Sequence, residues 1–428
     1  MEIFINPGRD TWKRLTSRTR EDDSSIDETV TSIIRRVREE GDAALYDLTE
    51  RIDGIRPDSL EVREEEIRAA SGTIPDRLKQ ALGQAAENIR KFHQAQMPAE
   101  ISIETMPGIR CVSRPVPIRS AGLYIPGGSA PLFSTVLMLA IPAQVAGCRQ
   151  TTLCTPPDRN GNISPLILYA ASLCGVGRIF RIGGAQAIAA MAYGTETVPK
   201  ADKIFGPGNR YVTRAKQMLS STVAIDMPAG PSEVMVLADG SARADFVASD
   251  LLSQAEHGPD SQVMLVCRSV EFAEKVREET EAGLARLPRR ELAAKALENS
   301  RIIVMDSIDD MVDFADMYAA EHLIISMKDP WKIASTITAA GSVFIGNHSP
   351  ESAGDYASGT NHTLPTSGWA GSYSGVNTES FMRRMTLQEL TREGLAALGD
   401  TIMTMASAEG LEGHRRAVEI RLREEQAN

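Results

Sequence analysis

Residues 152–193 read TLCTPPDRNGNISPLILYAASLCGVGRIFRIGGAQAIAAMAY, and this stretch decides the fold class. Two short apolar runs, 152–155 and 178–182, each precede a helical segment, 165–173 and 186–193. Such alternation, with Gly and Pro between the segments, is typical of βα units that build a parallel sheet. The stretch therefore predicts an α/β unit.

A second alternating series follows Pro231. Its expected strands and helices follow the same rhythm and cover 234–238, 242–256, 262–267, 270–285, 301–305, 308–320, 322–326 and 342–346. We therefore predict two Rossmann-like parallel-sheet units.

Helical segments flank the two units. Ser25 and Glu28 have the spacing of a capping box at the start of one helix, and residues 74–92 form a second amphipathic stretch. After Gly375 the chain becomes rich in Ala, Leu, Glu and Arg, which predicts helices over 387–405 and 411–425. A tail without strands cannot build a core alone, so it should pack on another domain or subunit.

Composition and charge exclude several classes of protein. The 428 residues suffice for two to four domains, and 42 % hydrophobic with 24 % charged residues excludes a disordered chain. Lys and Arg number 46 against 57 Asp and Glu, a net charge of −11, which disfavours nucleic acid as a partner.

The chain shows no targeting or membrane signal. The longest apolar run, 136–145, is interrupted by Pro142 and is far shorter than the roughly 20 residues of a membrane helix. The N-terminus lacks the pattern of a secretory signal, and five cysteines without C-x-x-C spacing fit reduced thiols. We expect a cytoplasmic protein with no membrane partner.

Three Gly-rich turns, at 122–128, 183–186 and 205–209, each lie between a strand-like and a helix-like run. Such turns lie at the carboxyl ends of parallel strands, where ligands bind and helix N-termini favour phosphate. None has the G-x-G-x-x-G pattern, so tight turns without a ligand remain an equal alternative.

Six histidines lie beside other polar groups. Gln254 and His257 are three residues apart at a helix end and could ligate one cation, although this pair alone is weak evidence. Glu321 and His322 place an acid and a base at an element boundary. The polar loop 349–362 carries Glu351, Asp355 and His362, and is either a functional loop or an exposed connection.

Glu409 and His414 flank a Gly410 break in the tail, where surface positions are the simpler interpretation. Gln, His, Asp and His side chains together would suit zinc or a similar divalent ion. Spacing leaves open whether Gln254, His257, Asp355 and His414 converge.

Three longer motifs give the chain a family resemblance. They are DMPAGPSEV at 226–234, DLLSQAEHGPD at 250–260 and GTNH at 359–362. With them the chain resembles the histidinol dehydrogenases, which carry out the last two oxidations of histidine synthesis. The resemblance is strong from 115 to 423 and weaker before.

The resemblance implies an α/β fold of the aldehyde/histidinol dehydrogenase type, in a homodimer whose helical C-terminal tail crosses to the other subunit. It implies these segments: 1–20 packing with the tail region; 21–120 and 234–375 as a larger α/β domain; 121–233 as a Rossmann-like, NAD-side domain; and 376–428 as a helical dimerisation tail.

The resemblance also implies the site. One zinc ion per subunit would be bound by Gln254, His257, Asp355 and His414, with Glu321 and His322 as the acid/base pair. NAD would contact Tyr124, Gln186 and Asn209 on the three Gly-rich turns. L-histidinol would contact Ser232, Gln254, His257, His322, Asp355, Glu409 and His414, with Glu351 and His362 nearby.

The implied chemistry is a four-electron oxidation of an alcohol to an acid. Zinc would orient the substrate, His322 would take the alcohol proton, and Glu321 would activate water for attack on the aldehyde. A thiohemiacetal on Cys148 or Cys111 is an alternative, although no adjacent His lowers either thiol pKa.

Two other functions compete with this interpretation. A related zinc and NAD dehydrogenase acting on a sulfonated diol would share the ligands and the acid/base pair. The motif around Ser232 with Glu409 and His414 favours histidinol. A catalytically silent zinc protein would need neither Glu321 nor His322.

Overall fold

The computed structural model describes residues 1–18, 24–127, 131–227 and 230–423, and the side chains of 24 and 25 also lie outside the description. The chain divides into two compact units. The first comprises Met1–Gln96 and Ile118–Phe381, and the second comprises Met97–Pro117 and Met382–Asn428. Each is described by itself.

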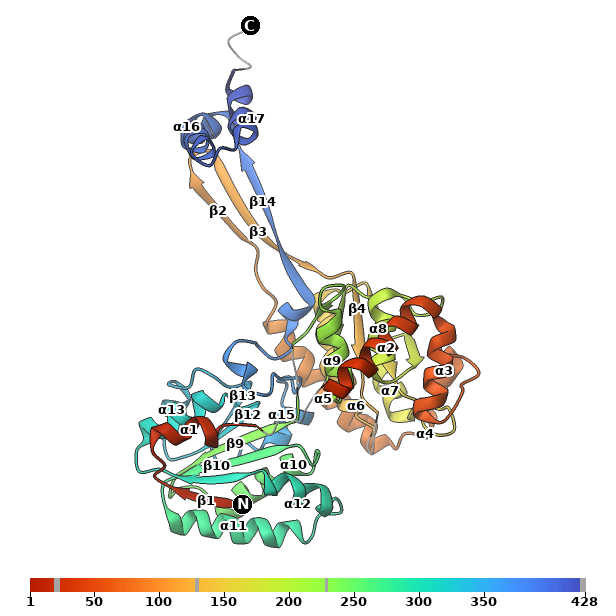
Figure 1. Cartoon of the computed structure of the whole chain (residues 1–428), viewed down its shortest axis with the longest axis vertical. Helices are drawn as coiled ribbons and strands as arrows, with labels where there is room; N and C mark the ends of the chain where they lie inside the picture. Colours follow the sequence, from red (N-terminus) through yellow and green to blue (C-terminus); the bar gives the residue numbers. More distant parts are fainter. Residues whose placement is uncertain (19–23, 128–130, 228–229, 424–428) are drawn as a thin grey trace. The chain divides into compact units, whose positions relative to one another are not determined.

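A six-stranded parallel sheet in the first unit has the order β1-β11-β10-β9-β12-β13 (Figure 1). Its strands are β1 (Glu2–Ile5), β9 (Glu233–Ala238), β10 (Gln262–Cys267), β11 (Arg301–Val304), β12 (His322–Ser326) and β13 (Ser342–Ile345). The covering helices are α1 (Arg9–Leu15), α10 (Ala244–Ala255), α11 (Val270–Leu284), α12 (Arg290–Glu298), α13 (Ile308–Tyr318) and α14 (Pro330–Ala334), and α15 (Glu351–Tyr356) follows β13.

Helices cover both faces of this sheet, which explains why β9 and β10 are continuous apolar runs buried at every position. Val234 and Val236 pack into a core with α10, α11 and α12. The alternate residues Met235 and Leu237 pack into a second core with α1, α13 and α14. The period of two along β9 therefore supplies two cores.

A five-stranded parallel sheet in the same unit has the order β6-β5-β4-β7-β8. Its strands are β4 (Ser120–Tyr124), β5 (Gln150–Thr155), β6 (Arg178–Arg181), β7 (Lys203–Phe205) and β8 (Ala224–Ile225). The helices around it are α2 (Ser24–Glu40), α3 (Asp42–Asp53), α4 (Glu64–Thr73), α5 (Asp76–Ala95), α6 (Phe133–Ala146), α7 (Pro165–Leu173), α8 (Gly184–Tyr193) and α9 (Arg210–Leu219). Short 3-10 turns lie at Trp369–Gly371 and Thr378–Phe381.

The N-terminal third of the chain differs from the predicted segments. Residues 1–15 belong to the six-stranded sheet and its helices, because β1 pairs in parallel with β11 and Trp12 is buried edge-on against Phe314, 5.5 Å away. The packing of this segment with the tail region stays a prediction. Helix α2 does not join the larger domain, because Ile26 and Val30 are buried in one core with Ile188 of α8. An amphipathic pattern predicts that one face of a helix is buried, but it does not predict which sheet that face packs against. The predicted capping box falls on Ser25, outside the described side chains.

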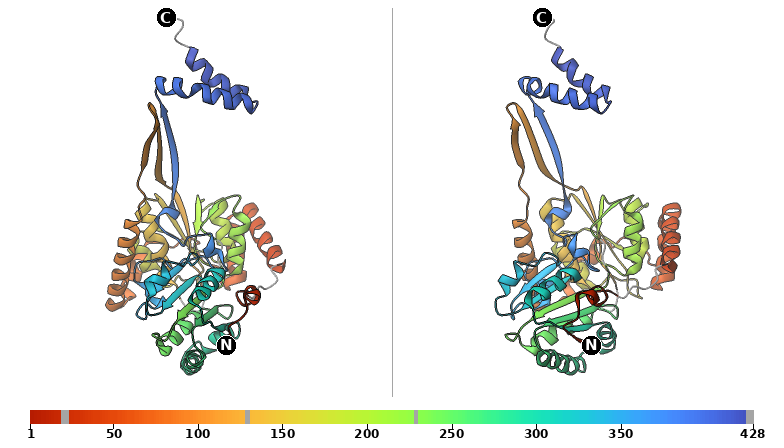
Figure 2. Two further views of the ribbon diagram at one scale, coloured as in Figure 1. Left: turned by 90° about the vertical axis from the view of Figure 1, so that its left-hand side faces the viewer. Right: turned by 60° about the vertical axis from the view of Figure 1, so that its left-hand side comes forward.

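The second unit contains an antiparallel sheet of order β14-β3-β2 (Figure 2). Its elements are β2 (Ile101–Met106), β3 (Ile109–Pro117), β14 (Met382–Leu390), α16 (Arg392–Ala408) and α17 (Glu412–Arg423). The prediction of a strandless helical tail is therefore wrong. The β14 sequence MRRMTLQEL consists mainly of helix-favouring residues, and its pairing with β3 along nine positions overrides that preference.

Within the described ranges, we find no helix with the length and apolar character needed to cross a membrane.

Candidate active site

Glu321 and His322 lie where β12 begins, beside the start of the adjacent strand β9. The strands are parallel, and His322 stands opposite Val234 in the register. The first residue of β9, Glu233, contacts both side chains through its main chain. Its N–H donates to Glu321 Oε2 at 2.9 Å, and its carbonyl oxygen lies 3.2 Å from His322 Nδ1. The predicted acid/base pair is therefore anchored to the neighbouring strand.

Glu321 is a buried carboxyl group. Burial raises the pKa of Glu321 to about 8, because the charged form loses its hydration, and His322 only partly opposes this shift. A carboxyl group with such a pKa exchanges a proton near neutral pH.

His322 lies among three carboxyl groups. Nδ1 is 3.7 Å from Glu321 Oε2 and 4.0 Å from Glu351 Oε1, and Nε2 is 3.5 Å from Asp355 Oδ1. Burial alone lowers the pKa of His322, but the carboxylates outweigh this effect and raise it to about 10. So much negative charge around one imidazole also favours a bound cation.

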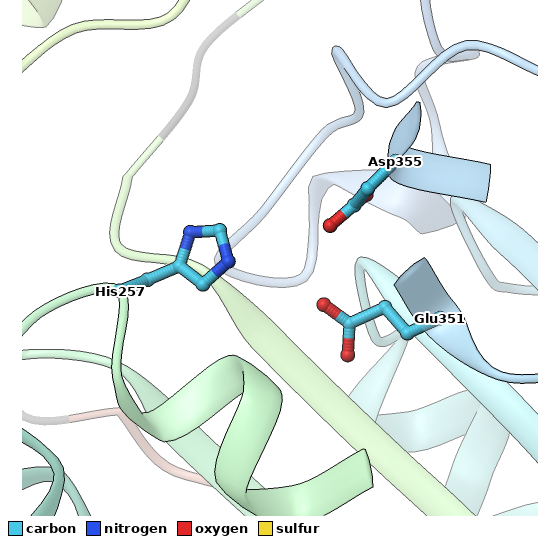
Figure 3. Close-up of side chains that lie close together, drawn as sticks. All are labelled: His257, Glu351 and Asp355. Carbon is cyan, nitrogen blue, oxygen red and sulfur yellow. The ribbon is translucent and has the colours of Figure 1, made fainter. Parts of the chain in front are cut away.

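His322 contacts two members of a group of potential metal ligands. Figure 3 shows this group. His257, Glu351 and Asp355 each offer one ligand atom, and these atoms lie within 4.8 Å of one another. Gln254 is buried beside them, and with its amide nitrogen turned toward Glu351 it donates to Oε2 at 3.1 Å. The structure thus brings together three of the predicted ligands, Gln254, His257 and Asp355. Their N and O atoms suit zinc or a similar divalent ion.

Glu351 joins this group, although sequence reasoning placed it only nearby. Its side chain is 1 % exposed, and burial raises its pKa well above the ordinary value. His362 also lies at the site: Nδ1 is 2.9 Å from the Asp355 carbonyl oxygen and Nε2 is 3.2 Å from Thr135 Oγ1. Burial of its carboxyl group is what distinguishes Glu351 as a site residue, and burial cannot be read from the sequence of this polar segment.

A small cavity of about 50 Å³ lies between Glu321 and the NAD-side sheet. Ser232 and Glu321 line it together with Gly206 and Pro207, which follow β7. The predicted substrate residue Ser232 and one predicted cofactor turn therefore border the same space.

The predicted NAD residues lie at the carboxyl edge of the five-stranded sheet. Tyr124 Oη accepts a hydrogen bond from Gly184 N–H at 3.0 Å. Gln186 is fully buried, and neither amide atom has a hydrogen-bond partner among the described residues. Asn209 caps α9 by accepting from the N–H groups of Tyr211 and Val212 at 3.1 and 3.2 Å. The unpartnered Gln186 amide fits a polar ligand, whereas Asn209 already has a structural function.

The two cysteines considered as nucleophiles gain no support. Burial raises the pKa of Cys148 to about 12, so its thiolate is scarce at neutral pH. Cys111 lies on β3 of the second unit.

Glu409 and His414 belong to the second unit, where Glu409 ends α16 and His414 lies in α17, and both side chains are exposed. The ligand group of the first unit does not contain them. Their assigned functions stay predictions.

Sequence reasoning missed a buried ion pair that fixes the turn after β7. Lys216 Nζ pairs with Asp226 and donates to the Gly206 carbonyl oxygen at 2.9 Å. Asp226 in turn accepts from Gly206 N–H at 2.8 Å and Met227 N–H at 2.8 Å. The pair shapes one wall of the cavity.

Replacing Lys216 by Met leaves the Asp226 carboxylate buried without its cation. We expect the free energy of unfolding to fall by about 3 to 5 kcal/mol, measured by urea denaturation at pH 7. The double variant Lys216→Met/Asp226→Asn should regain part of this loss, and Arg68→Met, which breaks an exposed pair with Glu64, should change stability by less than about 1 kcal/mol. Equal losses in Lys216→Met and Arg68→Met would contradict the assigned role.

The two parallel sheets, the buried acid/base pair and the adjacent ligand group all belong to the first unit. A family model described as histidinol dehydrogenase matches residues 16–422, which makes the protein an oxidoreductase that acts on an alcohol group. The chain belongs to the histidinol dehydrogenase family, an NAD-dependent class. The predicted resemblance and the α/β fold are thereby confirmed; tail exchange in a dimer is a separate prediction.

The similarity to individual relatives extends over nearly the whole length of both chains. The histidinol dehydrogenase of Bacteroides thetaiotaomicron is 53 % identical and that of Aliivibrio fischeri 54 %, with 99 % and 93 % of this chain and 99 % and 91 % of theirs covered. The crystal structure of histidinol dehydrogenase from Elizabethkingia anophelis is 50 % identical with a TM-score of 0.97, over 100 % of this chain and 99 % of that one.

Proposed function

We propose that the protein oxidises L-histidinol through L-histidinal to L-histidine, with reduction of two NAD and zinc in the ligand group. The observation that carries this proposal is the contact of His322 both with Glu321 and with the carboxylates of that group, in a chain related to histidinol dehydrogenases over nearly its whole length. The relatives described above favour histidinol over a sulfonated diol.

Gln254, His257 and Asp355 would hold zinc, together with His414 of the partner subunit. Their donor set and the surplus of carboxylates around His322 fit a divalent cation. When bound, zinc orients the amine and imidazole of the substrate and offsets this charge.

His322 acts as the base in the first oxidation. Its Nδ1 faces the Glu233 carbonyl oxygen at 3.2 Å, so in the neutral ring Nε2, which lies 3.5 Å from Asp355 Oδ1, is the nitrogen that takes the alcohol proton. The alcohol gives this proton to His322 and a hydride to NAD, which leaves the aldehyde and NADH. Neutral His322 is the competent form, and a cation among the carboxylates lowers its pKa toward that form.

Glu321 acts in the second oxidation. Its carboxylate takes a proton from water as the oxygen attacks the aldehyde, which gives the hydrated aldehyde. This diol then loses a hydride to a second NAD and a proton to the protein, and the acid results. Ser232, which borders the same cavity as Glu321, would contact the substrate with Glu409.

The second unit supports a homodimer with tail exchange. Several of its large apolar side chains are exposed: Ile101 52 %, Ile103 55 %, Met405 61 %, Leu411 44 % and Ile420 49 %. Exposed apolar surface on so small a unit indicates a protein partner. A partner's tail would bring His414 and Glu409 to the site.

The stoichiometry of NADH tests the function. We expect two NADH per L-histidinol consumed with excess NAD, abolished by a chelator and restored by zinc, as measured by absorbance with product analysis. One NADH per substrate would show that the reaction ends at the aldehyde and would remove the role of Glu321. If the protein forms no NADH with L-histidinol but oxidises a sulfonated diol, the diol and not histidinol is its substrate.

A further inference from the structure

We propose that Arg18 is a positioning residue for Glu321 and His322, acting through the side chain of Glu233. The inference rests on the proposed function of this site and assigns the N-terminal segment a part in it.

Glu233 holds both members of the acid/base pair with its main chain. Its N–H donates to Glu321 Oε2 at 2.9 Å, and its carbonyl oxygen faces His322 Nδ1 at 3.2 Å. A displacement of this one residue therefore moves the partners of both reactive side chains.

The carboxylate of Glu233 accepts three hydrogen bonds from two residues, Arg18 and Ser367. Arg18 donates to it in a bidentate manner, Nε to Oε1 and Nη2 to Oε2, both at 2.9 Å. The Ser367 N–H donates to Oε1 at 2.9 Å. The side chain is 2 % exposed, so water does not replace a lost donor. Without Arg18, a buried carboxylate keeps one of its three hydrogen bonds.

Arg18 also contacts the chain that leads into Glu321. Its Nη2 donates to the Tyr318 carbonyl oxygen at 2.5 Å, and its guanidinium carbon lies 3.8 Å from the centre of the Tyr318 ring. The next residue, Ala319, has a φ of +49°, a left-handed conformation that is strained for an alanine. Arg18 thus ties the start of β9 to the strained turn immediately before Glu321 and His322.

The geometry requires arginine in particular. A planar guanidinium can serve two carboxylate oxygens, a carbonyl oxygen and a ring face at once, whereas a lysine ammonium is a single point of charge. Arg18→Lys therefore keeps the positive charge but loses the bidentate hydrogen bonding to Glu233. This variant separates positioning from simple charge compensation.

Misplacement of Glu321 should chiefly slow the hydration of the aldehyde, because that step needs a base at a fixed distance from the attacking water. Misplacement of a reacting group by about 1 Å can lower the rate 100-fold. We expect Arg18→Lys and Arg18→Met to lower kcat by about 10- to 100-fold, with less than a threefold change in the KM for L-histidinol. The ratio of NADH to histidinol should fall below two, and a carbonyl reagent should trap L-histidinal.

The experiment uses full-length, zinc-loaded protein, with circular dichroism to establish folding. Arg14→Met is the matched control, since Arg14 is an exposed arginine of the same segment, near the Phe4 ring, and it should keep the wild-type kcat and ratio. If Arg18→Met fails to fold, Arg18→Lys carries the test. Millimolar guanidinium should restore part of the kcat of Arg18→Ala and not of Glu321→Gln.

Folded Arg18 variants with wild-type kcat and two NADH per histidinol would overturn the proposal. A loss of kcat in which the ratio stays at two and guanidinium gives no rescue would also overturn it. Failure of the proposed function is a separate result, because the wild-type protein itself would then not yield two NADH.

Discussion

Replacing His322 by Ala is expected to lower kcat for L-histidinol by about 10²- to 10⁴-fold at near-neutral pH, because no other described imidazole occupies the start of β12. The zinc content should stay at the wild-type value, since Gln254, His257 and Asp355 remain. Steady-state NADH formation and metal analysis of the same preparation measure both quantities.

His348→Ala is the matched control. This imidazole is exposed, its ring centre lies 6.2 Å from that of Phe246, and it is not one of the grouped ligands. It should retain wild-type activity and zinc. If His322→Ala loses its metal together with its activity, His322 belongs to the ligand set; an unchanged kcat would remove it from the reaction.

Mixing two inactive proteins is expected to restore activity if the tail is exchanged. Glu321→Gln lacks the base, and His414→Ala lacks the ligand given to the partner. In their heterodimer, one site contains Glu321 of one chain and His414 of the other, so half the sites should be intact. Co-refolding with two affinity tags and formation of L-histidine by the purified heterodimer measure this recovery, because Glu321→Gln lacks the base of the second oxidation.

The matched control is a heterodimer of Glu321→Gln with His322→Ala. Glu321 and His322 are sequence neighbours in one unit, so each site contains one defect whichever tail it receives. We expect no recovery there. Absence of recovery in verified heterodimers of the first pair would refute tail exchange.

The sequence predicted the parallel sheets because their strands are buried on both faces. Runs such as VMVLA at 234–238 and VMLVC at 263–267 leave little choice of element. The same reasoning failed for β14, where Arg383, Arg384 and Gln388 give no strand signal. Only pairing with β3, about 270 residues earlier, makes this segment extended.

The site was predictable in its residue types more than in its architecture. The motifs indicated Glu321, His322 and Asp355 because their resemblance to a family is specific. The residues that support the site were not visible in the sequence, because Arg18 acts through Glu233, 215 residues later in the chain, and no sequence pattern marks Lys216 as the partner of Asp226. No local sequence pattern distinguishes Arg18 and Lys216 from the arginines and lysines that lie on the surface.

The position of β1 affects the order in which the protein can fold during synthesis. Residues 2–5 leave the ribosome about 300 residues before their partners, residues 301–304 of β11. At about 5 to 20 residues per second, the strand waits on the order of 15 to 60 s for its neighbour. Until then EIFI is an unpaired apolar segment open to aggregation or chaperones. A fusion partner placed before β1 would be present while β1 is still unpaired. A fusion partner placed after the tail would be synthesised only after all strands of the sheet.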